Sequence, residues 1–158
     1  MDKKFDIARV TNAVKEHRFV EALSLIEGNL AHNPNHKDSL YLGAVCSRYL
    51  KNYEDAKKYS REILDLGVKN VVVTLGDLGV YFENNSDNHF EPALELGQKV
   101  IDTSGAGDAF NGSFATALCE NKNILEAIKF ANVYAGISTT RIGTANSMPE
   151  RDEIEKML

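Results

Sequence analysis

DTSGAGDAF occupies residues 102–110 and continues as NGSFATAL, so a run of small residues leads into a predicted helix. Small residues let a backbone approach a ligand closely, and the free N–H groups and positive dipole end of a helix start favour an anion. Asp108 stands at that helix start, where a carboxylate can accept the proton of an attacking hydroxyl. The stretch has no Walker-type lysine, and such turns also serve packing alone. Spacing by itself leaves a phosphate site and a structural turn as alternatives.

The chain around this stretch predicts an α/β segment over residues 67–158. VKNVVVTLGDLGVYFEN reads as a strand, a glycine-flanked turn and a second strand. The uniform run VVVTL at residues 71–75 predicts a strand buried on both faces, as in a parallel sheet. HFEPALEL predicts another edge strand or an irregular connection, and VID the end of a strand. Helices are expected over 107–120 and 125–141, with a short one over 151–158.

Residues 5–66 show apolar positions at three- and four-residue spacing, which predicts amphipathic helices. Three pairs of similar residues are 34 residues apart: Phe19 and Tyr53, Ala22 and Ala56, Leu30 and Leu64. This period and the small residue at each helix crossing resemble tetratricopeptide repeats. The second unit departs from that pattern, with Ser60 at a usually large apolar position. We therefore expect tetratricopeptide-like helical hairpins in residues 1–66, followed by the α/β segment.

Composition narrows the classes of partner. The 158 residues carry a net charge of −5, with lysines scattered among acids, so nucleic-acid binding is not expected. No apolar run is long enough for a membrane span, and the first residues lack a secretory pattern, which predicts a cytoplasmic protein. Cys46 and Cys119 are expected to be free thiols. His32 and His36 have a metal-like spacing, but Pro34 between them predicts a solvated loop.

Residues 67–158 resemble the ribokinase, or PfkB, family of carbohydrate kinases. The resemblance rests on four motifs that occur in the order and spacing of that family: TLGDLG, DTSGAGDAFNG, EAIKFAN and TTRIGTANSMP. The resemblance implies a partial ribokinase-like α/β fold and ATP-dependent phosphoryl transfer to a sugar hydroxyl. It also implies ATP and Mg²⁺ as cofactors, with K⁺ in some members.

The resemblance assigns roles to individual residues. Asp108 resembles the catalytic base, and the backbone of Gly105, Ala106 and Gly107 resembles the anion hole for the transferred phosphate. The predicted nucleotide-binding residues are Thr74, Leu75, Gly76, Gly79 and Asn132. The residues at the positions of a monovalent-cation site are Asp102, Ser104, Ser138, Arg141, Gly143 and Ser147. Oxygen ligands of this kind suit a hard cation.

One departure from the family leaves alternatives open. The family's sugar-binding first half has no counterpart here, because the helical repeats stand in its place. NYED at 52–55 could be mistaken for the family's acidic Asn-x-x-Glu element, but it lies inside a repeat. The chain could be a sugar kinase or its nucleotide-binding remnant, or a non-catalytic repeat protein that binds a protein or peptide partner. A chimera of two parents is a third reading. An uncovered sheet edge would favour a homodimer.

Overall fold

The computed structural model describes residues 6–158, which form two compact units. The first contains the residues up to Leu75 together with Tyr81–Asn88, and the second contains Gly76–Val80 and His89–Leu158. Each unit is described in turn. The predicted boundary between residues 66 and 67 remains a prediction.

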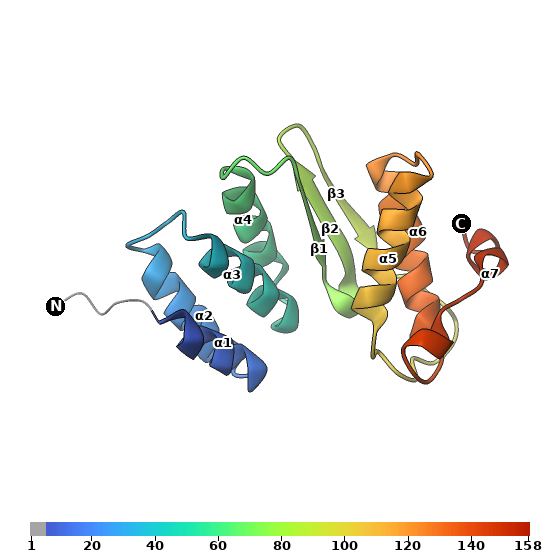
Figure 1. The fold of residues 1–158 in the computed structure, drawn as a ribbon, viewed down its shortest axis with the longest axis horizontal. Coiled ribbons are helices and arrows are strands. Elements are labelled where there is room, and N and C mark those ends of the chain that lie inside the picture. The colour runs from blue at the N-terminus through green and yellow to red at the C-terminus, as the bar shows by residue number, and fades with distance from the viewer. Residues whose placement is uncertain (1–5) are drawn as a thin grey trace. The chain divides into compact units, whose positions relative to one another are not determined.

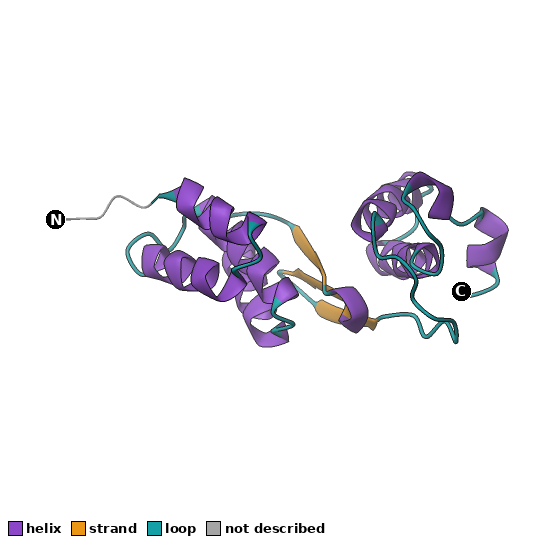
Figure 2. Ribbon diagram, turned by 90° about the horizontal axis from the view of Figure 1, so that it is seen from below, coloured by secondary structure: helices purple, strands orange, loops and turns teal. Residues whose placement is uncertain are grey.

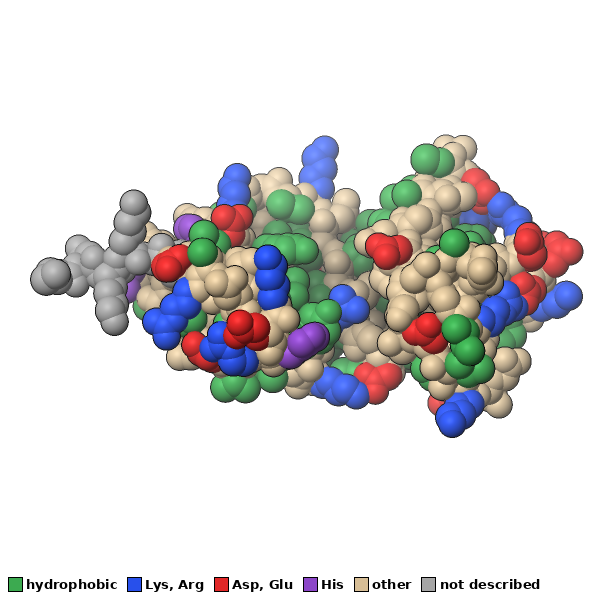
Figure 3. Space-filling model, turned by 60° about the horizontal axis from the view of Figure 1, so that its bottom comes forward, with side chains coloured by type: hydrophobic (Ala, Val, Ile, Leu, Met, Phe, Trp, Pro, Cys, Tyr) green, Lys and Arg blue, Asp and Glu red, His purple; other side chains and the backbone are tan. Residues whose placement is uncertain are grey.

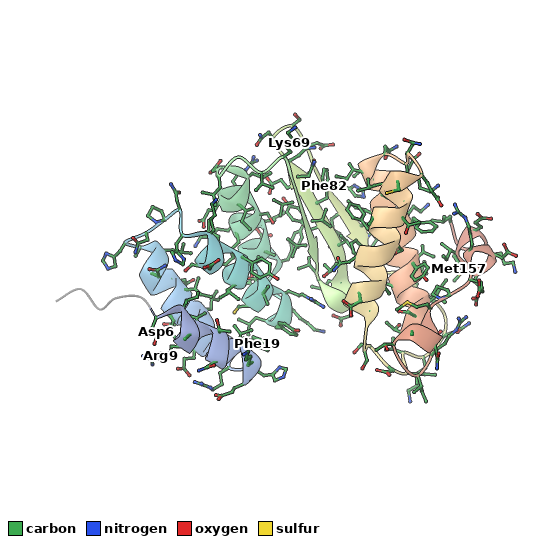
Figure 4. All side chains as sticks on the ribbon, viewed as in Figure 1. Asp6, Arg9, Phe19, Lys69, Phe82 and Met157 are labelled. Atoms are coloured by element: carbon green, nitrogen blue, oxygen red, sulfur yellow. The ribbon has the colours of Figure 1, made fainter. Side chains whose placement is uncertain are left out.

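The first unit begins with four helices, drawn from blue to green in Figure 1: α1 (Ile7–Lys15), α2 (Phe19–Leu30), α3 (Lys37–Tyr49) and α4 (Tyr53–Leu64). Each helix packs on the next one along the chain. Side chains cap several starts: Asp6, labelled in Figure 4, accepts the N–H groups of Ala8 and Arg9. His36 caps α3 by accepting the N–H of Ser39, so this predicted loop residue has a structural role. The helical prediction for this region is confirmed.

Packing in these helices differs from the repeat interpretation at one of its two alanines. Ala22 is fully buried in a cluster with Val10 and Ile26, between α1 and α2. Ala56, by contrast, packs with Leu75 and Tyr81. The close approach of α3 and α4 occurs at Gly43, where an added Cβ would lie 2.6 Å from the Tyr59 ring.

Three strands form one sheet in the order β1 (Asn70–Thr74), β2 (Gly79–Asn84) and β3 (Asn88–Pro92), shown in orange in Figure 2. Neighbouring strands are joined by connections far shorter than a parallel crossover needs, so both pairs are antiparallel. The predicted parallel sheet is therefore wrong for these strands. Full burial also falls on β2 and not on β1. The edge strand predicted within HFEPALEL is present as β3.

One buried charge lies on β2. Glu83 is only 5% exposed, and its carboxylate accepts a hydrogen bond from the Tyr81 hydroxyl at 3.0 Å. Its other oxygen lies 2.9 Å from Arg61 of α4. Burial, followed by the hydrogen bond to Glu83, raises the pKa of Tyr81. The ion pair offsets the cost of burying this carboxylate.

The second unit contains α5 (Ala106–Cys119), α6 (Ile124–Ser138) and α7 (Arg151–Glu155), with short 3₁₀ turns η1 (Gly76–Leu78) and η2 (Ala145–Ser147). Helix α6 packs against both α5 and α7. The core of this unit consists of Ala117, Ala127, Phe130, Val133, Ile137 and Ile154. All three predicted helices are present, and α6 ends three residues earlier than expected. The predicted strand at VID is absent, because residues 99–103 have no regular structure.

Acidic and basic side chains are interspersed on the face shown in Figure 3. In the part of the chain that the structure describes, no helix combines the length and apolar character of a membrane span. Both cysteines are free, Cys46 buried and Cys119 exposed.

Candidate nucleotide and phosphate site

Gly105 sets the geometry at the start of α5. It is the N-cap, and its φ of 77° lies in the left-handed region that favours glycine. A Cβ at this position would also lie 3.1 Å from the side chain of Thr144. The first intrahelical bond runs from the N–H of Ala109 to the Gly105 carbonyl at 2.8 Å. The backbone conformation thus favours glycine here, and a side chain would also require Thr144 to shift.

The backbone N–H groups before Ala109, in the first turn of α5, are the ones able to bind an anion. Gly107 and Asp108 lie in the first turn, where N–H groups have no intrahelical acceptor. The N–H of Ala106 already donates to Thr103 at 3.2 Å. A Cβ added at Gly107 would meet no atom within 4 Å, so the approach to this turn is open. Of the predicted anion-hole residues, Gly107 is therefore the best placed, and the N–H of Asp108 lies beside it in the same turn.

Asp108 is exposed in the first turn of α5. Beside it lies an open groove of about 450 Å³, whose wall includes Gly112 and Thr116 of α5 and Phe130 and Tyr134 of α6. Among residues 6–158, no group pairs with the Asp108 side chain. An accessible carboxylate without a partner retains its capacity to accept a proton from a bound hydroxyl.

Asp102 connects the glycine-rich turn to a distant loop. Its Oδ1 accepts the N–H of Ser104 at 2.9 Å, and its Oδ2 accepts the N–H of Gly143 at 3.0 Å. The Gly143 hydrogen bond, followed by those from Ser104, lowers the pKa of Asp102. The N–H groups of Ile101 and Asp102 also donate to the carbonyl of Thr139. These contacts hold the turn against the end of α6 without a strand.

Among the other predicted cation residues, Ser104 and Gly143 donate their N–H groups to Asp102. Ser138 is the last residue of α6, and Arg141 and Ser147 follow it in the chain. The hydroxyls of Ser138 and Ser147 donate to carbonyls of their own turns at 2.7 Å. Arg141 pairs with Glu153, and this pairing lowers the pKa of Glu153. Nowhere in residues 6–158 do three or more His, Cys, Asp or Glu side chains cluster in a way that could hold a metal ion. Any cation here would depend on carbonyl and hydroxyl oxygens beside the single carboxylate of Asp102, a donor set that suits an alkali ion.

The predicted nucleotide residues divide between the two units. Thr74 ends β1 and Leu75, only 1% exposed, belongs to the core of the first unit. Gly76 and Gly79 lie in the second unit with φ values of 63° and 119°. A Cβ at Gly79 would lie 2.1 Å from the carbonyl oxygen of Glu91, whereas one at Gly76 would meet nothing within 4 Å. Gly79 is therefore required for packing against β3, whatever else it does.

Asn132 uses its amide within the protein. Its Nδ2 donates to the carbonyl of Pro92 at 2.6 Å, which links α6 to the end of β3. This bond gives the side chain of Asn132 a structural role. The Oδ1 atom of the same amide remains an acceptor.

Sequence reasoning missed the contacts that hold α7. Arg151 donates to Glu120 at the end of α5 at 2.8 Å and to Glu155 at 2.9 Å. Its guanidinium also lies 5.8 Å from the centre of the Phe130 ring. The pairing with Glu120 and Glu155 raises the pKa of Arg151 and lowers that of Glu120. The sequence carried no local signal for this, because residues 120 and 151 are far apart.

A glycine-capped helix start beside an exposed carboxylate, in a chain of mixed helices and strands, is typical of α/β proteins that handle phosphate groups. Residues 34–151 match the model of the pfkB family carbohydrate kinases. The chain belongs to the pfkB family of carbohydrate kinases.

Individual relatives agree with this assignment. The chain is 35% identical to a ribokinase of Haemophilus influenzae over 87% of its own length and 42% of that protein. Its fold is similar to that of Thermotoga maritima ribokinase, with a TM-score of 0.64 and 41% identity over 73% of this chain and 38% of that one. A structure of Arabidopsis thaliana ribokinase complexed with ribose and ATP is similar with a TM-score of 0.62 and 31% identity, covering 66% of this chain and 34% of that one. The chain therefore spans less than half the length of these relatives.

The comparisons give no support to tetratricopeptide repeats. The family match begins at residue 34, so it includes α3 and α4, which the repeat interpretation had assigned to its second unit. The packing of Ala56 with Leu75 and Tyr81 agrees with this result, because it joins α4 to the strand region. The match to the kinase family thus does not begin at the predicted boundary between residues 66 and 67.

Proposed function

We propose that this chain supplies the nucleotide-binding and proton-accepting part of a ribokinase-like, ATP-dependent sugar kinase. Asp108 accepts the proton of the sugar hydroxyl as that oxygen attacks the γ-phosphorus. The bond from this phosphorus to the β,γ-bridging oxygen breaks, and ADP leaves. The observation that carries the proposal is that the exposed Asp108 carboxylate, which has no partner among residues 6–158, lies in the same helix turn as N–H groups without an intrahelical acceptor.

The first turn of α5 contributes electrostatically. N–H groups at Gly107 and Asp108 and the positive end of the helix dipole stabilise the negative charge on the transferred phosphate. Gly105 and Asp102 act indirectly, because they fix the course of the turn that presents those groups. We assign the adenine side of the nucleotide to the loop formed by Gly76 and Gly79 and to Asn132, with Thr74 and Leu75 preceding it.

Mg²⁺ would enter with the ATP phosphates and neutralise their charge. For a monovalent cation such as K⁺, the candidate ligands are oxygens of Asp102 and of the residues at 104, 138, 141, 143 and 147. The acceptor we propose is a pentose or hexose, because ribose and fructose occur in the names of similar structures.

Calorimetric titration with ATP and Mg²⁺, at high and low K⁺, tests the nucleotide site directly. We expect Gly107→Leu to weaken ATP binding, because the new side chain fills the open approach to the helix start. The matched control is Gly112→Leu, where an added Cβ also meets open space further along α5. Equal ATP affinity in these two variants and the wild type would refute the phosphate role of the helix start.

Asp108→Asn tests the base. The variant should retain ATP affinity and lose phosphoryl transfer by about 10²-fold or more, as expected when a general base is removed. Transfer is measured as ADP formed with ribose or fructose present, in a complex that contains a sugar-binding part. Unchanged transfer in the variant would assign the base to another residue.

A further inference from the structure

Residues 141–144 form a short segment that touches the glycine-rich turn before α5 at two points. The N–H of Gly143 donates to the carboxylate of Asp102 at 3.0 Å. The next side chain, Thr144, lies against Gly105, since a Cβ added to this glycine would come within 3.1 Å of the Thr144 Cγ2 atom. Whatever fixes the segment therefore also fixes the backbone that leads into the first turn of α5.

The segment does not fix its own course. Residues 141–144 belong to no helix or strand. Gly143 has a φ of 98°, and a Cβ added there would meet no atom within 4 Å, so neighbouring atoms do not confine it. Because glycine is conformationally permissive, the local sequence leaves this backbone free to adopt other conformations. A contact from outside the segment is needed to hold it.

The carboxylate of Glu153, in α7, supplies that contact. One of its oxygens pairs with the guanidinium of Arg141, and both side chains are only 36% exposed. Its other oxygen accepts the N–H of Glu150 at 2.8 Å, at the start of α7. The next residue, Ile154, is 1% exposed in the core of the second unit and anchors the helix there. Glu153 thus connects the segment to a helix that is held by the core.

We propose that Glu153 is a positioning residue for the phosphate site. Through Arg141 it holds residues 141–144 in place, and these residues hold the glycine-rich turn that presents the N–H groups of α5. The consequence for ATP binding rests on the proposed function. The positioning contact itself can be measured in the chain without any ligand.

A second ion pair of α7 provides a matched control. Arg151 pairs with Glu120, and the two side chains are 50% and 34% exposed, so this pair is about as accessible to water as the first. Glu120 lies just after the C-terminal end of α5, whereas the glycine-rich turn lies before its start. Glu153→Gln and Glu120→Gln each remove one negative charge from an ion pair of α7. The amide oxygen in Glu153→Gln can still accept the N–H of Glu150.

Amide hydrogen exchange, followed by NMR, measures the contact. The N–H of Gly143 exchanges only when its hydrogen bond to Asp102 opens. We expect Glu153→Gln to accelerate this exchange by about fivefold, the effect of losing a partly exposed ion pair. Glu120→Gln should leave it unchanged. Unchanged exchange in Glu153→Gln would overturn the proposal, and so would equal acceleration in both variants, because α7 would then act only through its general packing.

Calorimetric titration with ATP and Mg²⁺ measures the consequence for the site. Glu153→Gln and Arg141→Gln should each weaken ATP binding by about fivefold. Arg141→Lys keeps the positive charge and should restore most of the affinity, and Glu120→Gln should bind ATP as the wild type does. Urea unfolding of each variant checks that it is folded.

The two measurements separate this inference from the proposed function. If the wild type binds ATP and Glu153→Gln binds it equally well, the positioning role of Glu153 is refuted. If the wild type does not bind ATP, the proposed function fails, and the exchange of the Gly143 N–H alone decides whether Glu153 holds the segment.

Discussion

Gly79→Ala is the perturbation whose cost follows most directly from the structure. The residue has a φ of 119°, and forcing an L-residue into a positive φ costs about 1–2 kcal/mol. The new Cβ would lie 2.1 Å from the Glu91 carbonyl oxygen and 2.6 Å from the nitrogen of Ala93. These are backbone atoms that cannot rotate away, so overpacking adds about 1–3 kcal/mol. We expect a total loss of about 2–5 kcal/mol in the free energy of unfolding.

Gly76→Ala is the control for backbone strain alone. Its φ is 63°, but an added Cβ would meet no atom within 4 Å. The strain of about 1 kcal/mol is partly offset because alanine reduces the entropy of the unfolded chain. Urea unfolding of both variants, followed by circular dichroism, measures the difference. Equal unfolding midpoints would refute the packing argument, and a loss of ATP affinity without destabilisation in Gly79→Ala would assign this glycine to nucleotide binding.

Further predictions concern titration and thiol reactivity. Since hydrogen bonds to Gly143 and Ser104 lower the pKa of folded Asp102, its contribution to stability is full above the unfolded pKa of about 3.9 and is lost as the pH falls towards the lowered value. Asp102→Asn should flatten this acid limb of a stability profile, and an unchanged slope would contradict the assignment. Burial raises the pKa of the Cys46 thiol to about 11, so iodoacetamide at pH 8 should modify Cys119 and spare Cys46 in the folded protein, as read by peptide mass spectrometry.

Local sequence signals predicted the elements that carry the candidate site. The glycine-rich turn followed by a proline-free run of mainly small and apolar residues located α5, and the turn residues around Gly76 located the hairpin of β1 and β2. Where the prediction failed, the missing information was tertiary. VID has an extended pattern, but the N–H groups of Ile101 and Asp102 donate to Thr139 at the end of α6 and not to a strand. No sequence feature near residue 102 predicts that Thr139 is the hydrogen-bond acceptor.

The repeat interpretation failed for a related reason. A small residue at a fixed period shows that something packs closely there, but not what the neighbour is. Ala56 packs with Leu75 and Tyr81, while the close contact between α3 and α4 is made by Gly43 against the ring of Tyr59. Periodicity therefore gave the helices correctly and assigned one of their contacts wrongly. Gly43 lies outside the alanine pattern and could have been recognised as a crossing point only from the structure.

Charge placement carries information that periodicity does not. A predicted helix with charges on one side is consistent with a solvent-facing position, as α4 confirms through its exposed Glu54, Lys58 and Arg61. Helix α5 has no charge over the eleven residues after Asp108, yet it leaves Ala115 and Leu118 exposed in these 158 residues. An exposed helix face without charges has the residue composition that is usual for a covered face. The only charge of α5 lies in its first turn, where the carboxylate of Asp108 interacts favourably with the positive end of the helix dipole.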